Sequence, residues 1–86
     1  MHTVELVREA IALAQRAGYR IRQEYLGSAM GGGCEFGGRK WVFLDVSSGP
    51  ADQLDQLLGV LRHNPAVTGM PMSDELRNRV AAKKTA

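Results

Sequence analysis

The chain has 86 residues, a hydrophobic fraction of 44% and a formal net charge of +2 at pH 7. This length fits one domain with a modest core and excludes a second domain. Its one cysteine excludes an internal disulfide framework, and no apolar run reaches the length of a membrane span. We therefore expect a cytoplasmic protein with no signal peptide and no membrane partner.

The positive charge is concentrated near the C-terminus. Residues 73–86 hold four basic and two acidic residues, which account for the whole net charge: Arg77, Arg79, Lys83, Lys84, Asp74 and Glu75. Basic residues at the end of a helix are explained by the helix dipole and by solubility. We therefore do not expect a nucleic-acid partner, and binding through this tail is kept only as an alternative.

Residues 4–17 have the apolar spacing of a helix, with Thr3 as a suitable N-cap and Gly18 at the left-handed position that follows. Residues 19–26 then alternate with period two. One face holds Tyr19, Ile21, Gln23 and Tyr25, and the other holds Arg20, Arg22, Glu24 and Leu26. A charged face predicts an antiparallel strand with one solvated side.

A hairpin is predicted by Cys34–Phe36 and Arg39–Val46 around Gly37-Gly38, a dipeptide typical of type I′ turns. Its second strand is apolar on both faces, which indicates a central strand or one covered on both sides. One side should meet the helices. The other would expose Trp41 and Phe43 unless a loop, the tail or a second subunit covers them.

The second helix is predicted to open at Ser48-Gly49-Pro50 and to end at Asn64-Pro65. Its apolar stripe is the clearest in the chain: Leu54, Leu57, Leu58 and Leu61. Ser73 can cap a short helix over residues 74–82. The sequence thus predicts an α+β fold with an N-terminal helix, a three-stranded antiparallel sheet, a Leu-rich helix and a short C-terminal helix. Residues 1–82 would form the domain, and 83–86 a frayed basic tail.

The most unusual segment is Gly27–Gly38, which holds six of the ten glycines and the only cysteine. It could cradle an anion, display a reactive thiol, or let the chain pass closely over the sheet with Cys34 buried. The third, structural interpretation is preferred, because phosphate-binding loops lead into a helix and this one leads into a strand. The candidate ligand-binding residues are Gly31, Gly32, Gly33, Cys34 and Arg39.

Other chemistry is weakly supported. A catalytic thiol needs a histidine base, and His63 is expected at the far end of the second helix. The chain has one cysteine and two histidines, and three such residues are too few for a structural zinc site. We therefore expect no metal and no cofactor. Asp45 ends the apolar strand, and we expect Ser47, Ser48 or the next helix to satisfy it.

Three segments resemble a family of small bacterial α+β proteins: Tyr19–Gly27, Gly31-Gly32-Gly33-Cys34 and Gly38–Val46. That family has a Gly-Gly-Gly-Cys loop before a Leu-rich helix, and the resemblance implies no activity. The order of strands and helix is also similar to the front of compact zinc metallopeptidases. Those enzymes carry His-Glu-x-x-His on the helix after the hairpin. Gln53–Leu57 occupies that place here and contains no histidine, so the resemblance implies no zinc peptidase.

We therefore expect a non-catalytic interaction or regulatory module, homodimeric through the aromatic sheet face. The expected contact residues are Tyr19, Tyr25, Trp41 and Phe43. The first alternative is a site for a small anion, a nucleotide or a metal on the Gly27–Gly38 loop, with Cys34 taking part. The second is weak nucleic-acid binding through the basic tail.

Overall fold

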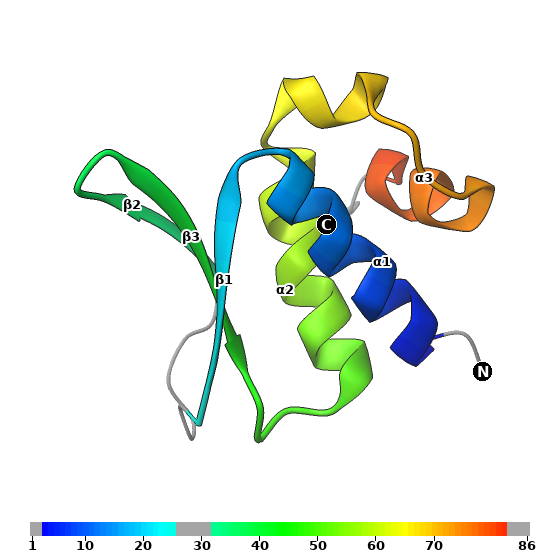
Figure 1. Cartoon of the computed structure of the whole chain (residues 1–86). Helices are drawn as coiled ribbons and strands as arrows, with labels where there is room; N and C mark the ends of the chain where they lie inside the picture. The colour runs from blue at the N-terminus through cyan, green and yellow to red at the C-terminus, as the bar shows by residue number, and fades with distance from the viewer. Residues whose placement is uncertain (1–2, 26–31, 83–86) are drawn as a thin grey trace.

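The structure is a computed structural model that describes residues 3–25 and 32–82, with only the backbone at residues 32–34 and 36. Three helices lie on one side of a three-stranded sheet (Figure 1). The helices are α1 (Thr3–Arg16), α2 (Pro50–Arg62) and α3 (Asp74–Ala81), with a 3-10 turn, η1 (Pro65–Gly69), before the last. The strands are β1 (Tyr19–Glu24), β2 (Gly32–Phe36) and β3 (Arg39–Asp45).

The sheet is mixed, and the prediction of an antiparallel sheet is wrong. Its strand order is β1-β3-β2, with β1 parallel and β2 antiparallel to β3. A strand that is apolar on both faces is most stable in the centre, where β3 lies. The glycine-containing β2 takes an edge, since glycine weakens a strand interior. Alternation in β1 correctly indicated one wet face, but it carries no information on strand direction.

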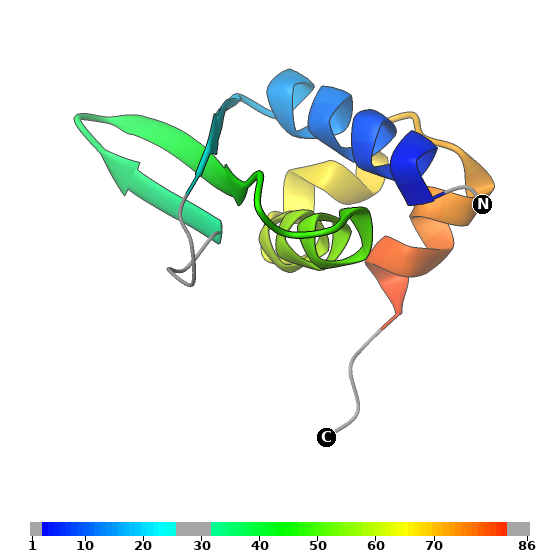
Figure 2. The same cartoon turned by 90° about the horizontal axis from the view of Figure 1, so that it is seen from below.

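The β2–β3 hairpin is tight, as predicted. Gly37 and Gly38 both have positive φ angles, of 62° and 74°, which a type I′ turn requires at its two central residues. The hairpin extends beyond the helices (Figure 2). Strand β2 begins at Gly32, two residues earlier than predicted, so Gly32 and Gly33 belong to the sheet.

The core lies between the helices and one face of the sheet. Val42 and Leu44 of β3 are fully buried, and the leucines of α2 pack with α1 against them. Ala10 and Ala14 are also fully buried, and such small side chains let a helix approach its neighbour closely. Helix α1 ends at the left-handed Gly18, with φ of 100°, as predicted.

The C-terminal segment is held to the helices by polar contacts. The carboxylate of Glu9 accepts hydrogen bonds from the backbone N and the hydroxyl of Ser73, at 2.6 and 2.7 Å. The same hydroxyl accepts from the backbone N of Leu76 and caps α3. Arg16 donates to the carbonyl of Pro71 at 3.0 Å, so α1 fixes the start of α3 from two sides.

Within the described ranges, no helix is both long and apolar enough to cross a membrane.

Leu57 lies at the centre of the core, with no exposed surface. Leu57→Ala should lower the free energy of unfolding by about 2–5 kcal/mol, because it removes buried methyl groups and leaves a cavity. Val4→Ala is the control: Val4 is also on a helix but 49% exposed, so the expected change is below about 0.5 kcal/mol. Urea unfolding measures both, and equal effects would contradict this placement of the core.

Candidate binding surface on the outer face of the sheet

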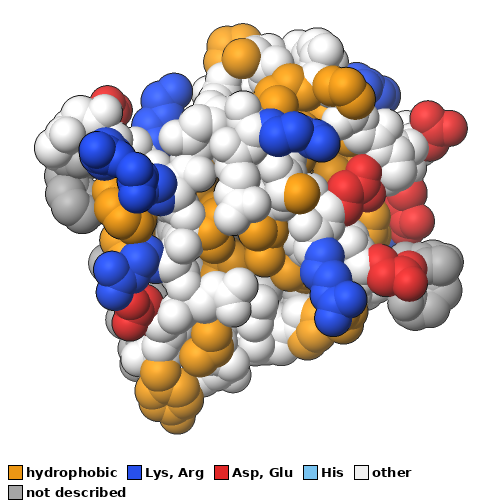
Figure 3. All heavy atoms as spheres, viewed as in Figure 1, with side chains coloured by type: hydrophobic (Ala, Val, Ile, Leu, Met, Phe, Trp, Pro, Cys, Tyr) orange, Lys and Arg blue, Asp and Glu red, His pale blue; other side chains and the backbone are white. Residues whose placement is uncertain are grey.

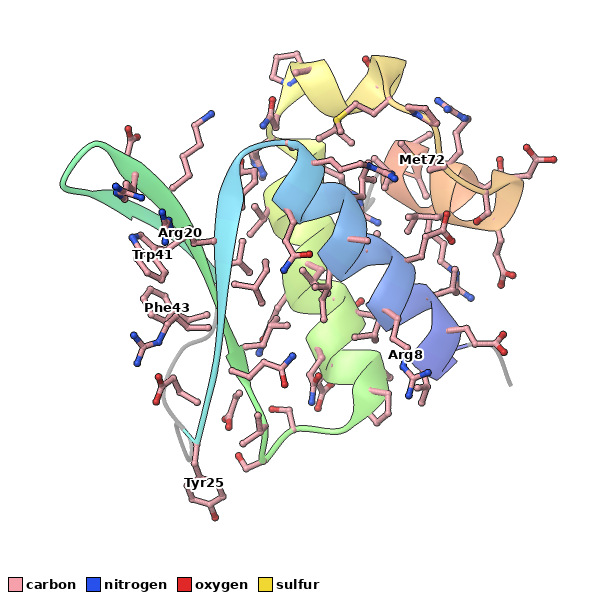
Figure 4. All side chains as sticks on the ribbon, viewed as in Figure 1. Arg8, Arg20, Tyr25, Trp41, Phe43 and Met72 are labelled. Carbon is pink, nitrogen blue, oxygen red and sulfur yellow. The ribbon has the colours of Figure 1, made fainter. Side chains whose placement is uncertain are left out.

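The two faces of the sheet differ in what they carry. Partners in register share a face, so Ile21 and Val42 point toward the helices, and Arg20 and Trp41 point away. Figure 4 shows Arg20, Trp41 and Phe43 on the side away from the helices. We call this the outer sheet face, and it comprises Arg20, Arg22, Glu24, Arg39, Trp41 and Phe43.

Two aromatic rings form the centre of this face. The ring centroids of Trp41 and Phe43 are 6.0 Å apart, and the ring planes differ by 14°. Both side chains are half-buried. Positions i and i+2 of one strand point the same way, so the central strand alone aligns these two rings.

Arg20 lies over one of these rings. Its Cζ is 5.9 Å from the ring centroid of Trp41, which is within the range of a cation–π contact. The parallel register makes Arg20 the partner of Trp41, and Arg22 the partner of Phe43. The arginine–aromatic contact therefore follows directly from the pairing of β1 with β3.

The outer sheet face is positively charged. Arg22 donates its Nε to Glu24 at 2.8 Å and also forms an ion pair with this carboxylate. These side chains are 53% and 39% exposed, so the pair contributes at most about 1 kcal/mol. Arg39 is exposed at the start of β3, on the same face as Trp41. Figure 3 shows basic and hydrophobic side chains together at the edge of the molecule that holds the sheet.

Asp45 ends β3 but adds no exposed carboxylate to this face. Only 2% of its surface is exposed, and its Oδ1 accepts hydrogen bonds from the backbone N and the hydroxyl of Ser47, at 2.9 and 2.6 Å. The expectation that Ser47 satisfies Asp45 is confirmed. In the described part of the chain, the outer sheet face thus carries three arginines and one exposed carboxylate, that of Glu24.

The structure separates the four predicted contact residues. Trp41 and Phe43 lie together, whereas Tyr19 lies on the inner face and packs against the core. The hydroxyl of Tyr19 accepts a hydrogen bond from Asn64 at 3.4 Å, and Lys40 lies 5.6 Å from its ring centroid. Tyr25 follows β1 and is 78% exposed at the end of the sheet (Figure 4).

The predicted ligand-binding residues are also spread out. Gly31 and the rest of residues 26–31 lie outside the described residues. The backbones of Gly32, Gly33 and Cys34 pair with Phe43, Val42 and Trp41. Arg39 pairs with Phe36 at the opposite end of the hairpin. Arg39 therefore lies beside one end of β2, and Gly32 is at the other end.

Catalytic and metal-binding candidates gain little support. His63 is the C-cap of α2, and its Nδ1 lies 2.6 Å from the carbonyl oxygen of Gly59 in that helix. Among residues 3–25 and 32–82, no group of three or more His, Cys, Asp or Glu side chains could hold a metal ion. The segment of α2 that was compared with the His-Glu-x-x-His helix of zinc metallopeptidases carries Leu54 and Leu57, and both of these side chains lie in the core.

From the sequence, Arg20 and Arg22 were interpreted as a solvated strand face whose charges could pair with Glu24, and Arg22 does pair with Glu24. Their alternation with Tyr19 and Ile21 did show that they share a face. Their position beside Trp41 and Phe43 depends on pairing with residues about twenty positions away. No local pattern encodes that register.

Comparison with known proteins adds no further assignment: no family model, no curated protein and no solved structure matches the chain.

The contact between Arg20 and Trp41 can be measured directly. A double-mutant cycle with Arg20→Ala and Trp41→Ala should give a coupling free energy of about 0.5–1 kcal/mol in urea unfolding, as expected for an exposed cation–π pair. The control cycle pairs Arg8→Ala, on α1, with Trp41→Ala and should show no coupling. A coupling of zero for Arg20 would mean that its guanidinium leaves the ring in solution.

Proposed function

We propose that this chain is a non-catalytic interaction module of the cytoplasm that binds an anionic partner through the outer sheet face. The observation that carries the proposal is the combination of two aligned aromatic rings with three arginines on that face. All described helices lie on the other side of the sheet (Figure 1). A cytoplasmic location is supported by the single cysteine, which cannot form a disulfide within the chain.

Charge argues for an anionic partner. Residues 1–72 have no net charge, yet among the described residues the outer sheet face carries three arginines and one exposed carboxylate. A face of one sign attracts ligands of the other sign and raises their rate of association. Such attraction acts over about 8 Å at physiological ionic strength, so binding should weaken as salt is added.

A second copy of the chain is the other candidate occupant. The two half-buried rings favour it, since a homodimer would shield them from water. However, a two-fold interface places the same patch of each copy face to face. It would bring Arg20, Arg22 and Arg39 of both copies together, and juxtaposed like charges are unfavourable. An anionic partner avoids this cost.

The basic tail is a weaker candidate than the sheet. Arg77 donates to the carbonyls of Thr68 and Met70, both at 3.0 Å. Arg79 pairs with Glu75 one turn earlier in α3, at 3.6 Å. Two of the four tail cations therefore have partners within the chain. The small-ligand alternative on the Gly27–Gly38 loop stays a prediction, since much of that loop lies outside the described residues.

Titration with polyphosphate and with polyglutamate tests the proposal. Trp41 is the only tryptophan, so its fluorescence reports directly on the outer sheet face. At least one polyanion should change the emission in a saturable, salt-sensitive manner. Arg20→Gln/Arg39→Gln should weaken binding about tenfold, because each exposed ionic contact contributes on the order of 0.7 kcal/mol.

A matched control removes the same charge elsewhere. Arg8→Gln/Lys84→Gln changes one helical residue and one tail residue, and binding should stay within about twofold of the unmodified chain, less than 0.5 kcal/mol. Equal losses in the two double variants would contradict the proposal, and so would the absence of binding to any polyanion. Sedimentation tests whether a second copy occupies the outer sheet face. If the chain forms a dimer that Trp41→Ala dissociates, the homodimer is the correct function and the anionic partner is not.

A further inference from the structure

We infer that the anionic partner is single-stranded nucleic acid, with bases stacked on Trp41 and Phe43 and phosphates bound by Arg20 and Arg39. This inference rests on the proposed function, because it names the partner of the same face. It uses a different surface from the basic tail considered in the sequence analysis.

The aromatic rings favour bases over an acidic peptide. Single-stranded nucleic acids are commonly held by aromatic side chains on a sheet or barrel surface, because every base presents a π-face. The rings of Trp41 and Phe43 are stacked on each other, with centroids 6.0 Å apart and planes 14° apart, so a base can extend a stack that already exists. An acidic peptide would meet the arginines but has no aromatic base that could extend this stack.

The arginines lie where a backbone that passes over the rings can reach them. Arg20 is on β1, beside Trp41 in the register, and Arg39 is on β3, two residues before Trp41. Both side chains are exposed, so their donors are accessible to phosphate oxygens. The guanidinium plane of Arg20, already close to the Trp41 ring, can also stack on a base. Arg22 is a weaker candidate, since Glu24 neutralises it.

The shape of the face favours single strands over a duplex. Bases in a duplex are stacked on each other and offer only their edges in the grooves. The rings of Trp41 and Phe43 lie on the broad face of a sheet, with helices on its other side (Figure 4). Unstacked bases can lie on such a face, as they do in sheet-based RNA-binding modules.

The test uses labelled oligothymidylate of about 12 nucleotides, within the site size of such modules, and an abasic oligomer of equal length. The abasic oligomer keeps every phosphate and lacks every base. Fluorescence anisotropy should show the oligothymidylate binding about tenfold more tightly, because stacking is lost without bases. A duplex of the same length should bind less tightly than the single strand.

The variants separate stacking from charge. Trp41→Ala should weaken binding of oligothymidylate about tenfold and change binding of the abasic oligomer less than about twofold. Trp41→Phe should retain most of the affinity, since it keeps an aromatic ring. Arg39→Gln should lower the slope of log affinity against log salt by about 0.7, the value for one phosphate contact on a single strand.

The control is Tyr25→Ala, which removes an aromatic ring that is 78% exposed and lies beyond the end of β1. Its affinity for oligothymidylate should be unchanged. Circular dichroism verifies the fold of each variant, and Phe43→Ala replaces Trp41→Ala if the latter does not fold.

The outcomes separate this inference from the proposed function. Equal binding of the two oligomers, with polyanion binding retained, overturns the inference and leaves the anionic surface standing. Tighter binding of polyglutamate or of a duplex overturns it as well. Loss of binding to every polyanion overturns both.

Discussion

The parallel pairing of β1 with β3 determines which side chains lie on each face of the sheet. One face of the pair places Ile21 beside Val42, where the helices cover them. The other face places Arg20 beside Trp41, and the two side chains form a cation–π contact there. Because side chains alternate along a strand, shifting β1 by one residue would send Ile21 to the outer face and Arg20 toward the core. Burial of the apolar residues on one face therefore fixes the arginine–aromatic pairs on the other.

The helices complete only one layer. Helices α1 and α2 each have a single buried stripe, and both stripes are used against the inner face and against each other. Helix α3 buries Leu76 and Val80 at the far side of the helical layer, away from the sheet (Figure 2). None of these described helices has a second apolar face that could cover the outer side of the sheet. In the described part of the chain, no helix therefore covers the outer side of the sheet, where Trp41 and Phe43 lie.

Sequence reasoning was accurate where the signal was local. The helical periodicity located all three helices to within one residue at most ends, and Gly37-Gly38 identified the hairpin turn. It failed where the signal was long-range. Alternation in β1 is the same for a parallel and an antiparallel neighbour, so the strand direction was predicted incorrectly. The strand was predicted to begin at Cys34, after Gly32 and Gly33, yet pairing with β3 draws both glycines into the sheet. The position of Arg20 over Trp41 had no local signature at all.

The net charge of the sequence did not predict where positive charge is exposed, because the arginines have two distinct roles. One group stabilises the C-terminal part of the chain by donating to backbone carbonyls: Arg16 to Pro71, Arg62 to Arg79 and Val80, and Arg77 to Thr68 and Met70. Arg62 in particular satisfies carbonyls in the last turn of α3, where the helix leaves acceptors without partners. The second group lies on the outer sheet face, where the exposed carboxylate of Glu24 neutralises only one of three. The charge that can act on a partner is therefore set by which arginines the fold leaves on that face. The excess of basic residues near the C-terminus, counted from the sequence, does not measure the charge on that face.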